Sequence, residues 1–275
     1  MPELPEVEIV RRGLEQRLNG RRLHRVQVRE PGLRWPVPET IASRLPGASL
    51  RAVVRRGKYL LLDFGHGFLI VHLGMSGHFR FLESGQQTEP DRHDHIDFEF
   101  EHGLLRYHDP RRFGAILWHE ATAGPVLAHP LLRALGVEPL SPDFDAATLH
   151  QALRARRTGI KSVLLAGRVV VGVGNIYASE SLFRAGIRPV TPAGTLSKPR
   201  CERLVTSIRA VLTEAIDCGG SSLRDFVASD GAAGCYQAVT RVYGRAGQPC
   251  RQCGATVQMI RQQGRSTFFC PRCQR

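Results

Sequence analysis

The sequence predicts an α+β multidomain protein, and three observations along its 275 residues support this prediction. Residues 5–19 have the apolar spacing of a leading helix. Residues 22–119 hold short apolar runs separated by Gly, Pro and acidic turns, which are typical of an antiparallel β-sandwich or barrel. Helical patterns follow residue 145, and two Cys-x-x-Cys pairs lie near the end of the chain. We therefore expect an N-terminal antiparallel β-sandwich with a leading helix, then a helical domain, then a zinc-ribbon β-hairpin.

The leading helix is predicted by residue spacing. Val7, Val10, Leu14 and Leu18 recur at steps of three and four residues, which gives one buried stripe. Pro5 suits the first helical turn, and an Asn-Gly pair after the stripe is a stop signal.

The domain boundaries are predicted from changes in composition. Residues 120–148 contain four prolines, which favour a connection over regular structure. We predict an N-terminal β domain at 1–133, a linker at 134–148, a helical domain at 149–240 and a cysteine module at 241–275. Within the helical part, the candidate helices are 145–155, 160–166, 175–185, 197–217 and 221–227.

The charge of the chain favours a polyanionic partner. Lys and Arg number 38 against 25 acidic residues, which gives a formal net charge of +13. No apolar run approaches the roughly eighteen residues of a membrane span. The acidic start MPELPEVE lacks the basic and apolar regions of a signal peptide, so a cytoplasmic location is expected.

The cysteines indicate a metal site. Of seven cysteines, three are scattered, whereas the other four form two Cys-x-x-Cys pairs. Two such pairs place four thiolates within reach of one Zn²⁺ at about 2.3 Å each, and four ligands leave no open position for catalysis. A reduced compartment with one structural zinc fits this spacing better than the alternative of a disulfide framework. The predicted zinc ligands are Cys250, Cys253, Cys270 and Cys273.

The segment between the cysteine pairs has the pattern of a basic hairpin. Residues 256–259 and 266–269 read as its strands, with residues 262–265 at its tip. Residues 241–275 contain seven Arg, no Lys and no acidic residue. Such a hairpin suits a nucleic-acid groove, although zinc ribbons also occur in protein-binding modules.

The N-terminus offers a nucleophile. Removal of Met1 before the small residue Pro2 exposes a secondary amine, which can attack an aldehyde carbon and form an iminium ion. Glu3 can supply or accept a proton at the same place. The alternative is that this proline-rich stretch is an ordinary helix start.

The chain as a whole resembles bacterial formamidopyrimidine-DNA glycosylase, within the larger group that includes endonuclease VIII. Leu4 favours the first branch. The matching stretches lie in order along the chain and are MPELPEVE (1–8), RRGKYLL (55–61), HLGMSG (72–77), HDH (93–95), DPRRFG (109–114), VGVGNIYASE (171–180), SDG (229–231) and VYGR-x-G-x-PC (242–250), followed by the four cysteines.

This resemblance implies a bifunctional DNA glycosylase and apurinic/apyrimidinic (AP) lyase of base excision repair. The enzyme would remove oxidised purines such as 8-oxoguanine and formamidopyrimidines, then nick the strand by β- and δ-elimination. The helical domain would contain a helix–two-turns–helix element. The implied partner is double-stranded DNA that contains damaged bases. The resemblance implies a monomer that does not bind membranes. It also implies a cytoplasmic protein that associates with the nucleoid by binding DNA.

The resemblance also implies roles for individual residues. Pro2 would be the Schiff-base nucleophile, Glu3 the general acid/base at the sugar, Lys58 an aid to β-elimination and Arg265 an aid to δ-elimination. The inserted wedge that holds the gap left by an extruded base would be Met75, Arg111 and Phe113. Core packing is the alternative for Met75 and Phe113. The implied phosphate contacts are His93, Arg111, Arg156, Lys161 and Asn175.

Departures from the family pattern keep other functions open. Around residues 231–236 the sequence GAAGCYQ places Cys235 and Tyr236 where the family often has Tyr-Phe, and it lacks the usual Lys, so lesion preference is the property that this departure affects. The alternatives are an endonuclease VIII-like glycosylase for oxidised pyrimidines and a non-catalytic zinc-ribbon DNA-binding protein. A second metal site among His72, His93, His95 and His108 is a further alternative.

Overall fold

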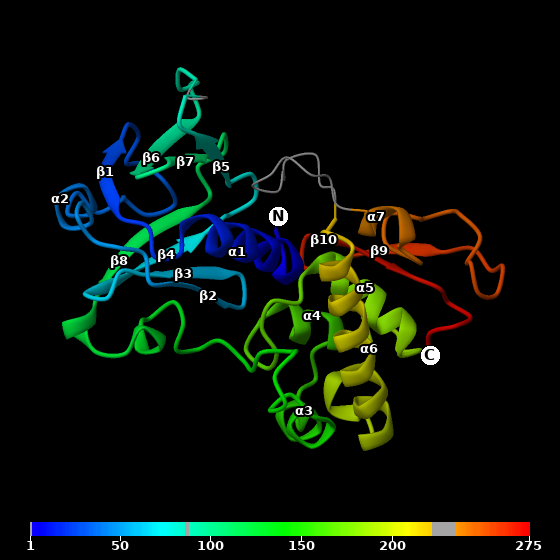
Figure 1. Ribbon diagram of the computed structural model, residues 1–275. Helices are drawn as coiled ribbons and strands as arrows, with labels where there is room; N and C mark the ends of the chain where they lie inside the picture. The colour runs from blue at the N-terminus through cyan, green and yellow to red at the C-terminus, as the bar shows by residue number, and fades with distance from the viewer. Residues whose placement is uncertain (1, 86–87, 222–234) are drawn as a thin grey trace. The chain divides into compact units, whose positions relative to one another are not determined.

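The computed structural model describes residues 2–85, 88–221 and 235–275 and divides the chain into two compact units (Figure 1). The first unit is Met1–Arg133 with Gly219–Cys235, and the second is Ala134–Cys218 with Tyr236–Arg275. Among the described helices, none is long and apolar enough to cross a membrane.

The first unit is an antiparallel sandwich with a leading helix. Its described strands form two four-stranded sheets, in the orders β1-β6-β7-β5 and β2-β3-β4-β8. A short helix, α2, and two 3-10 turns lie in its connections. The elements are α1 (Leu4–Leu18), β1 (Leu23–Val28), α2 (Ile41–Arg44), β2 (Ala52–Arg56), β3 (Tyr59–Asp63), β4 (Gly67–His72), β5 (His78–Glu83), β6 (Asp94–Phe100), β7 (Gly103–His108), β8 (Ala115–Glu120), η1 (Ala121–Ala123) and η2 (Val126–Ala128).

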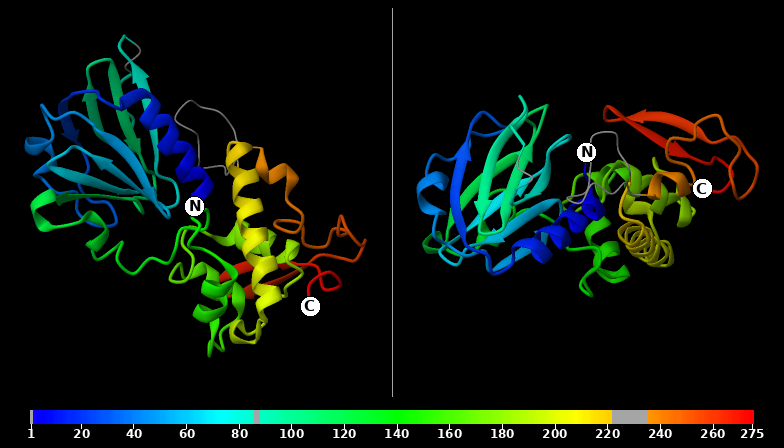
Figure 2. Two further views of the ribbon diagram at one scale, coloured as in Figure 1. Left: turned by 60° about the horizontal axis from the view of Figure 1, so that its bottom comes forward. Right: turned by 45° about the horizontal axis from the view of Figure 1, so that its top comes forward.

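One hydrophobic core joins both sheets and α1. In β6, Ile96, Phe98 and Phe100 alternate toward this core, as the two-residue period of a strand requires. The predicted stripe of α1 is buried in the same core, and the helix packs against β2 and β3 (Figure 2). The prediction of a leading helix and a β-sandwich is confirmed.

The second unit is helical and ends in a two-stranded sheet. Four of the five helices predicted between residues 145 and 227 are present within one or two residues of their expected bounds, and the fifth lies almost wholly outside the described residues. The elements are α3 (Ala146–Leu153), α4 (Ile160–Leu165), α5 (Asn175–Arg184), η3 (Ala193–Thr195), α6 (Lys198–Asp217), α7 (Tyr236–Val239), β9 (Gln258–Gln262) and β10 (Arg265–Phe269).

The terminal hairpin turns more tightly than the sequence predicts. Gln262 and Arg265 form a strand pair, so the tip consists of Gln263 and Gly264 alone. Both tip residues have positive φ, 48° and 76°, which is the geometry of a type I′ hairpin turn. Arg265 is therefore the first residue of β10 and not part of the tip.

Candidate functional site

The N-terminal end of α1 holds the first two predicted catalytic residues. Pro2 is buried, and Glu3, the residue before the helix, is only 3% exposed. A Glu6 oxygen accepts a hydrogen bond from the Glu3 backbone N–H at 2.9 Å and closes a capping box. The other Glu6 oxygen accepts from the backbone N–H and the hydroxyl of Ser221, each at 2.8 Å. This network fixes the start of the helix, whose positive end disfavours an ammonium ion at residue 2.

Lys58 lies at the tip of the β2–β3 hairpin. Arg56 and Tyr59 pair across the strands, so Gly57 and Lys58 alone make the turn. Gly57 has a φ of 59°, as expected for glycine at the first central position of a type II′ turn. This tight turn holds the partly buried Lys58 in a defined place beside the sheet.

His72, at the end of β4, is a polar neighbour of Lys58. Burial, followed by the charges of Lys58 and Arg34, lowers the pKa of His72 to about 4. Its Nδ1 accepts the Gly74 N–H at 3.0 Å, so the neutral ring carries its proton on Nε2. The site therefore contains a neutral imidazole N–H donor at His72, a residue to which the family resemblance assigns no role of its own.

The lowered pKa of His72 predicts a pH dependence of stability. The unfolded chain takes up a proton near pH 6.5, whereas the folded chain stays neutral at this ring down to about pH 4. Between these values the unfolded chain binds more protons, so this stabilisation is complete above about pH 6.5 and decreases as the pH falls toward 4, by at most about 3 kcal/mol. Urea denaturation across this range should show a steeper acid loss in the natural protein than in His72→Asn, which keeps an acceptor for the Gly74 N–H. Equal slopes would contradict the assignment.

The three predicted wedge residues lie on two neighbouring loops of the first unit. Met75 is in the β4–β5 loop, and Arg111 and Phe113 are in the β7–β8 loop. Phe113 is 47% exposed and so does not pack in the core, and the Arg111 guanidinium lies 4.7 Å from its ring centroid. The loops border a cavity of about 650 Å³, lined by Gly32, Leu33, Arg34, His72, Gly74, Met75, Arg111, Arg112 and Phe113.

Contacts from the segment after β1 support these loops. The Arg112 guanidinium donates to Glu30 at 3.1 Å, and Glu30 accepts the Gly32 N–H at 2.7 Å. The backbone N–H of Arg34 donates to the Gly114 carbonyl at 3.0 Å. No sequence motif marks Glu30 and Arg112 as partners, because they are 82 positions apart.

His93 lies just before β6 in a group of histidines. Its ring centroid is 5.8 Å from that of His108 and 6.4 Å from that of His95. It is partly buried, and its neighbour Arg92 is exposed.

The acidic residues beside His93 do not favour a second metal site. Ligand atoms of Asp91, Asp94 and His108 lie within 4.8 Å of one another. However, Asp94 is ion-paired with Arg80, and the Arg106 guanidinium lies 3.6 Å from it. Because two guanidinium groups already neutralise this carboxylate and would repel a divalent cation, the arrangement is better explained as an ion-pair cluster.

In the second unit, Lys161 and Asn175 connect the helices to the terminal hairpin. Lys161 is fully buried, and its Nζ donates to Asn175 Oδ1 at 2.7 Å, to Thr267 Oγ1 at 2.8 Å and to the Ser266 carbonyl at 3.2 Å. Asn175 Nδ2 donates to the same Ser266 carbonyl at 3.1 Å. Asn175 is also the first residue of α5 and follows a Gly-rich turn, where helix N–H groups favour an anion. The Lys161 charge is thus directed at protein oxygens that hold Asn175 beside β10.

The remaining predicted residues of the second unit share one surface. Arg156 and Arg265 are both exposed, and both line a cavity of about 230 Å³ between α4 and the hairpin turn. Gln263 and Ser162 line it as well. Two guanidinium groups with amide and hydroxyl neighbours form a surface suited to phosphate oxygens.

A buried carboxylate that the sequence did not single out holds the start of the cysteine module. Glu180 in α5 is 1% exposed and accepts the backbone N–H groups of Arg241, Val242 and Tyr243 at 2.8, 2.9 and 2.8 Å. Its position in the matching stretch VGVGNIYASE is the only sequence signal that points to it.

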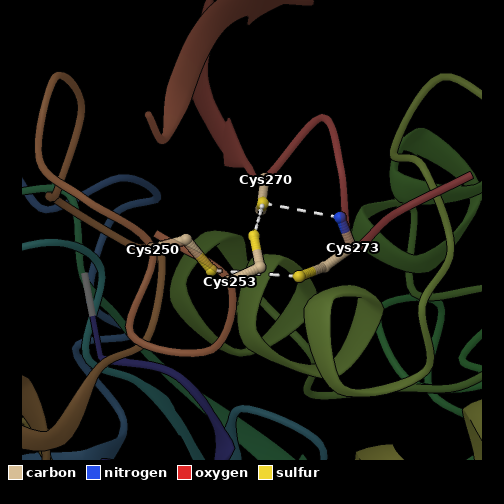
Figure 3. Close-up of side chains that lie close together, drawn as sticks. All are labelled: Cys250, Cys253, Cys270 and Cys273. Atoms are coloured by element: carbon tan, nitrogen blue, oxygen red, sulfur yellow. Dashed lines mark hydrogen bonds between the residues drawn. The ribbon is translucent and has the colours of Figure 1, made fainter. Parts of the chain in front are cut away.

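The four predicted zinc ligands converge (Figure 3). Their sulfur atoms lie within 4.8 Å of one another, with Cys253 and Cys270 at 3.5 Å and Cys250 and Cys273 at 3.9 Å. A tetrahedron with Zn–S bonds of about 2.3 Å has S–S edges of about 3.8 Å. The donor set therefore fits one structural Zn²⁺. Cys218 and Cys235 are disulfide-bonded, so the expectation of reduced thiols is wrong for these two.

The cysteine centre is attached to α5 and the turn after it. Cys250 and Cys270 pack in a small core with Phe183, Val242 and Val257. The buried Gln274 side chain accepts the Cys270 N–H and donates to the Ile187 carbonyl, both at 2.8 Å. The metal centre thus fixes the base of the β9–β10 hairpin on the helical unit.

Three family models match the chain in succession. These are the formamidopyrimidine-DNA glycosylase N-terminal domain at residues 1–116, the H2TH (helix–two-turns–helix) domain of the same family at 135–227, and the zinc finger found in FPG and IleRS at 247–275. Together they span both units.

Full-length relatives agree with these models. A formamidopyrimidine-DNA glycosylase of Burkholderia multivorans is 58% identical over the whole of both chains. A crystal structure of a mutant Lactococcus lactis FPG in complex with Fapy-dG-containing DNA covers 100% of both chains at 37% identity and a TM-score of 0.91. A second Lactococcus lactis Fpg structure, with abasic-site DNA, covers 99% of both at 36% identity and a TM-score of 0.90. The chain therefore belongs to the formamidopyrimidine-DNA glycosylase family of base excision repair enzymes, which combine DNA glycosylase and AP lyase activities.

Proposed function

We propose that this enzyme excises oxidised purines, among them 8-oxoguanine and formamidopyrimidines, through a Schiff base formed by Pro2. The observation that carries the proposal is the start of α1, where the buried Pro2 directly precedes Glu3, whose backbone the Glu6 network fixes at the positive end of the helix. The complex of the Lactococcus lactis relative with Fapy-dG-containing DNA supports this lesion class.

The first chemical step joins the enzyme to the sugar. The Pro2 nitrogen uses its lone pair to bond C1′, and the damaged base leaves with the electrons of the glycosidic bond and gains a proton. The ring then opens as the C1′–O4′ bond breaks. Glu3 takes the proton that the Pro2 nitrogen loses and transfers it to O4′, and an iminium ion between Pro2 and C1′ remains.

The next steps cut the strand. The iminium acidifies the C2′ proton, and its removal expels the 3′ phosphate by β-elimination. A second proton loss expels the 5′ phosphate by δ-elimination, and water then hydrolyses the iminium to restore the amine. We assign Lys58 to the first elimination and Arg265 to the second, because a cation beside the leaving phosphate stabilises the charge that develops there.

DNA binding is assigned to residues of both units. We propose phosphate contacts from His93, Arg111, Arg156 and Asn175, with Lys161 contributing through the Asn175 side chain that it holds. Met75, Arg111 and Phe113 are proposed to fill the gap left by the extruded base. Two apolar side chains can replace base stacking, and the guanidinium can hydrogen-bond to the unpaired base.

The domain bounds and the cellular location are inferred from the sequence. The four-part division at 1–133, 134–148, 149–240 and 241–275 and a cytoplasmic, nucleoid-associated location remain predictions. The altered segment at 231–236, expected to influence lesion preference, lies mostly outside the described residues, which resume at Cys235.

Lesion preference is tested with paired duplexes that contain 8-oxoguanine, a formamidopyrimidine or an oxidised thymine. We expect at least about tenfold faster cleavage of the two purine lesions, since a pocket with hydrogen-bond partners strongly rejects a mismatched base. The products should carry phosphate at both ends of the gap, as β,δ-elimination requires. Faster cleavage of the thymine lesion would support the endonuclease VIII-like alternative, and binding without cleavage would support the non-catalytic one.

A further inference from the structure

Asp109 is a buried carboxylate at the junction of the two wedge loops. It is fully buried, yet none of the cations in the described residues forms an ion pair with it. Its Oδ1 accepts the Ser76 hydroxyl at 2.7 Å. Its Oδ2 accepts the Gly114 N–H at 2.8 Å and the Tyr107 hydroxyl at 3.3 Å. Because a buried carboxylate is costly unless it is hydrogen-bonded, these three donors hold it in one orientation.

The partners of Asp109 are the sequence neighbours of the wedge residues. Ser76 follows Met75 in the β4–β5 loop, and Gly114 follows Phe113 in the β7–β8 loop. One carboxylate therefore joins the two loops directly. The Ser76 hydroxyl oxygen also accepts the Arg111 N–H at 3.3 Å, which adds a second connection between the same loops.

Close backbone contact leaves the junction little freedom. A Cβ on Gly74, which has a φ of 65°, would lie 2.4 Å from the Phe113 carbonyl carbon. A Cβ on Gly114 would lie 1.8 Å from the Tyr107 hydroxyl oxygen. The loops thus meet backbone to backbone, and Asp109 supplies the polar contacts at that meeting point.

We propose that Asp109 is a positioning residue that makes Met75, Arg111 and Phe113 insert into DNA as one rigid unit. This inference rests on the wedge role given under Proposed function. Asp109 itself is buried and touches no DNA in this role. Its loss would leave the chemistry at Pro2 in place and slow the filling of the gap.

The test measures insertion without requiring base excision. Duplexes carry a stable tetrahydrofuran abasic analogue with fluorescent 2-aminopurine opposite it, so that stopped-flow fluorescence follows the filling of the gap. Phe113→Ala tests whether the signal reports the wedge. Asp109→Ala, Asp109→Asn and Ser76→Ala test the junction. Asp97→Asn is the matched control, because Asp97 is also buried but pairs with Arg106 and Arg29, away from both loops.

We expect Asp109→Ala to slow insertion by at least about tenfold, because it removes acceptors from buried donors on both loops. Asp109→Asn should restore part of the rate, since the amide oxygen can still accept the Gly114 N–H. Ser76→Ala, which retains the carboxylate, should slow insertion by about fivefold, the effect of one hydrogen bond. Affinity for undamaged duplex should stay within about twofold of the natural protein's, because phosphate contacts dominate it.

The outcomes separate this inference from the function on which it rests. If Phe113→Ala abolishes the signal but Ser76→Ala and both Asp109 variants insert as fast as Asp97→Asn, the positioning role is overturned and the wedge stands. If Phe113→Ala leaves the signal intact, the wedge assignment is wrong and the inference is overturned with it. If Asp109→Ala does not fold, the insertion rates of Ser76→Ala and Asp109→Asn test the positioning role by themselves.

Discussion

A chain with one extra residue before Pro2 is expected to lose borohydride trapping on abasic-site DNA, by at least about a thousandfold. The extension converts the secondary amine of Pro2 into a tertiary amide, whose lone pair is delocalised and cannot attack C1′. The fold should be unaffected, because α1 begins at Leu4 and its stripe packs into the core independently of the terminus.

The amine at residue 2 is better suited to this attack than a lysine would be. A generic α-amino group with a pKa near 8 is about one-tenth neutral at pH 7, whereas a lysine with a pKa near 10.4 is neutral to roughly 0.04%. Proline is somewhat more basic than the generic amine, but the positive end of α1 acts against its protonation. The partly buried Lys58 is the competing amine in this unit, and an N-terminal extension leaves Lys58 unchanged.

The experiment uses one chain before and after processing. A removable N-terminal fusion is incubated with abasic-site DNA and borohydride, then cleaved to leave Pro2 first and incubated again. Trapping should be absent before cleavage and present after it, and peptide mapping should place the DNA on residue 2. A C-terminal extension of equal length controls for added mass, and Pro2→Gly, which keeps a terminal amine, should still trap. Trapping by the uncleaved fusion, or DNA mapped to Lys58, would refute the mechanism.

The sequence predicts well those features that depend on spacing along one segment. The stripe from Val7 to Leu18 determines one face of one helix, and the four cysteines need only two short knuckles and a hairpin to meet. In both cases the contacts that form the structure are made by the residues of the pattern and their sequence neighbours, so the pattern alone predicts the structure.

Features that depend on polar groups converging from distant segments were not predictable in this way. The resemblance implied Lys161 as a phosphate contact, yet oxygens from positions 175, 266 and 267 surround its ammonium group, although lysine is usually exposed. Asp109 and Glu180 lie inside recognised motifs, but only the fold shows that one joins two loops and the other holds three backbone N–H groups. Their burial follows from tertiary contacts that no local period encodes.

The tight turn of the β9–β10 hairpin shows that local sequence preference can also fail to predict structure at short range. The predicted strands at 256–259 and 266–269 left residues 262–265 as the tip, whereas the two-residue turn that forms places Gln263 at a left-handed position, which is uncommon for this residue. Strand pairing up to Arg265 overrides this local preference and brings that guanidinium onto the first residue of β10.

Removal of one zinc ligand is the second change with a very large expected effect. Cys250→Ser should release the metal and unfold residues 241–275 locally, because few other residues hold this module together. Its small core contains five buried residues, of which Cys250 and Cys270 are two. Structural zinc in comparable modules contributes about 10–16 kcal/mol of binding free energy, and this is free energy of folding for a segment that lacks a core of its own.

Unfolding of the module should also abolish DNA binding. The hairpin carries Arg265, and β10 supplies the Ser266 and Thr267 oxygens that hold the buried Lys161 ammonium. Without β10, Lys161 loses two of these acceptors and Asn175 loses its bond to the Ser266 carbonyl, so the proposed phosphate contact at Asn175 is disordered as well. Loss of the contributions of Asn175, Lys161 and the seven arginines of residues 241–275 should reduce affinity by about a thousandfold at physiological salt.

Zinc content and duplex binding should fall together in Cys250→Ser. Mass spectrometry of the metal measures the first, and fluorescence anisotropy measures the second. Cys201→Ser is the matched control, because Cys201 is equally buried in α6 but is not one of the four convergent thiols. It should retain one zinc per chain and bind DNA normally, at a modest cost in stability. Because the β-sandwich unit has its own core, its unfolding transition should be the same in both variants. Normal DNA binding by a zinc-free Cys250→Ser protein would show that the hairpin is held without the metal.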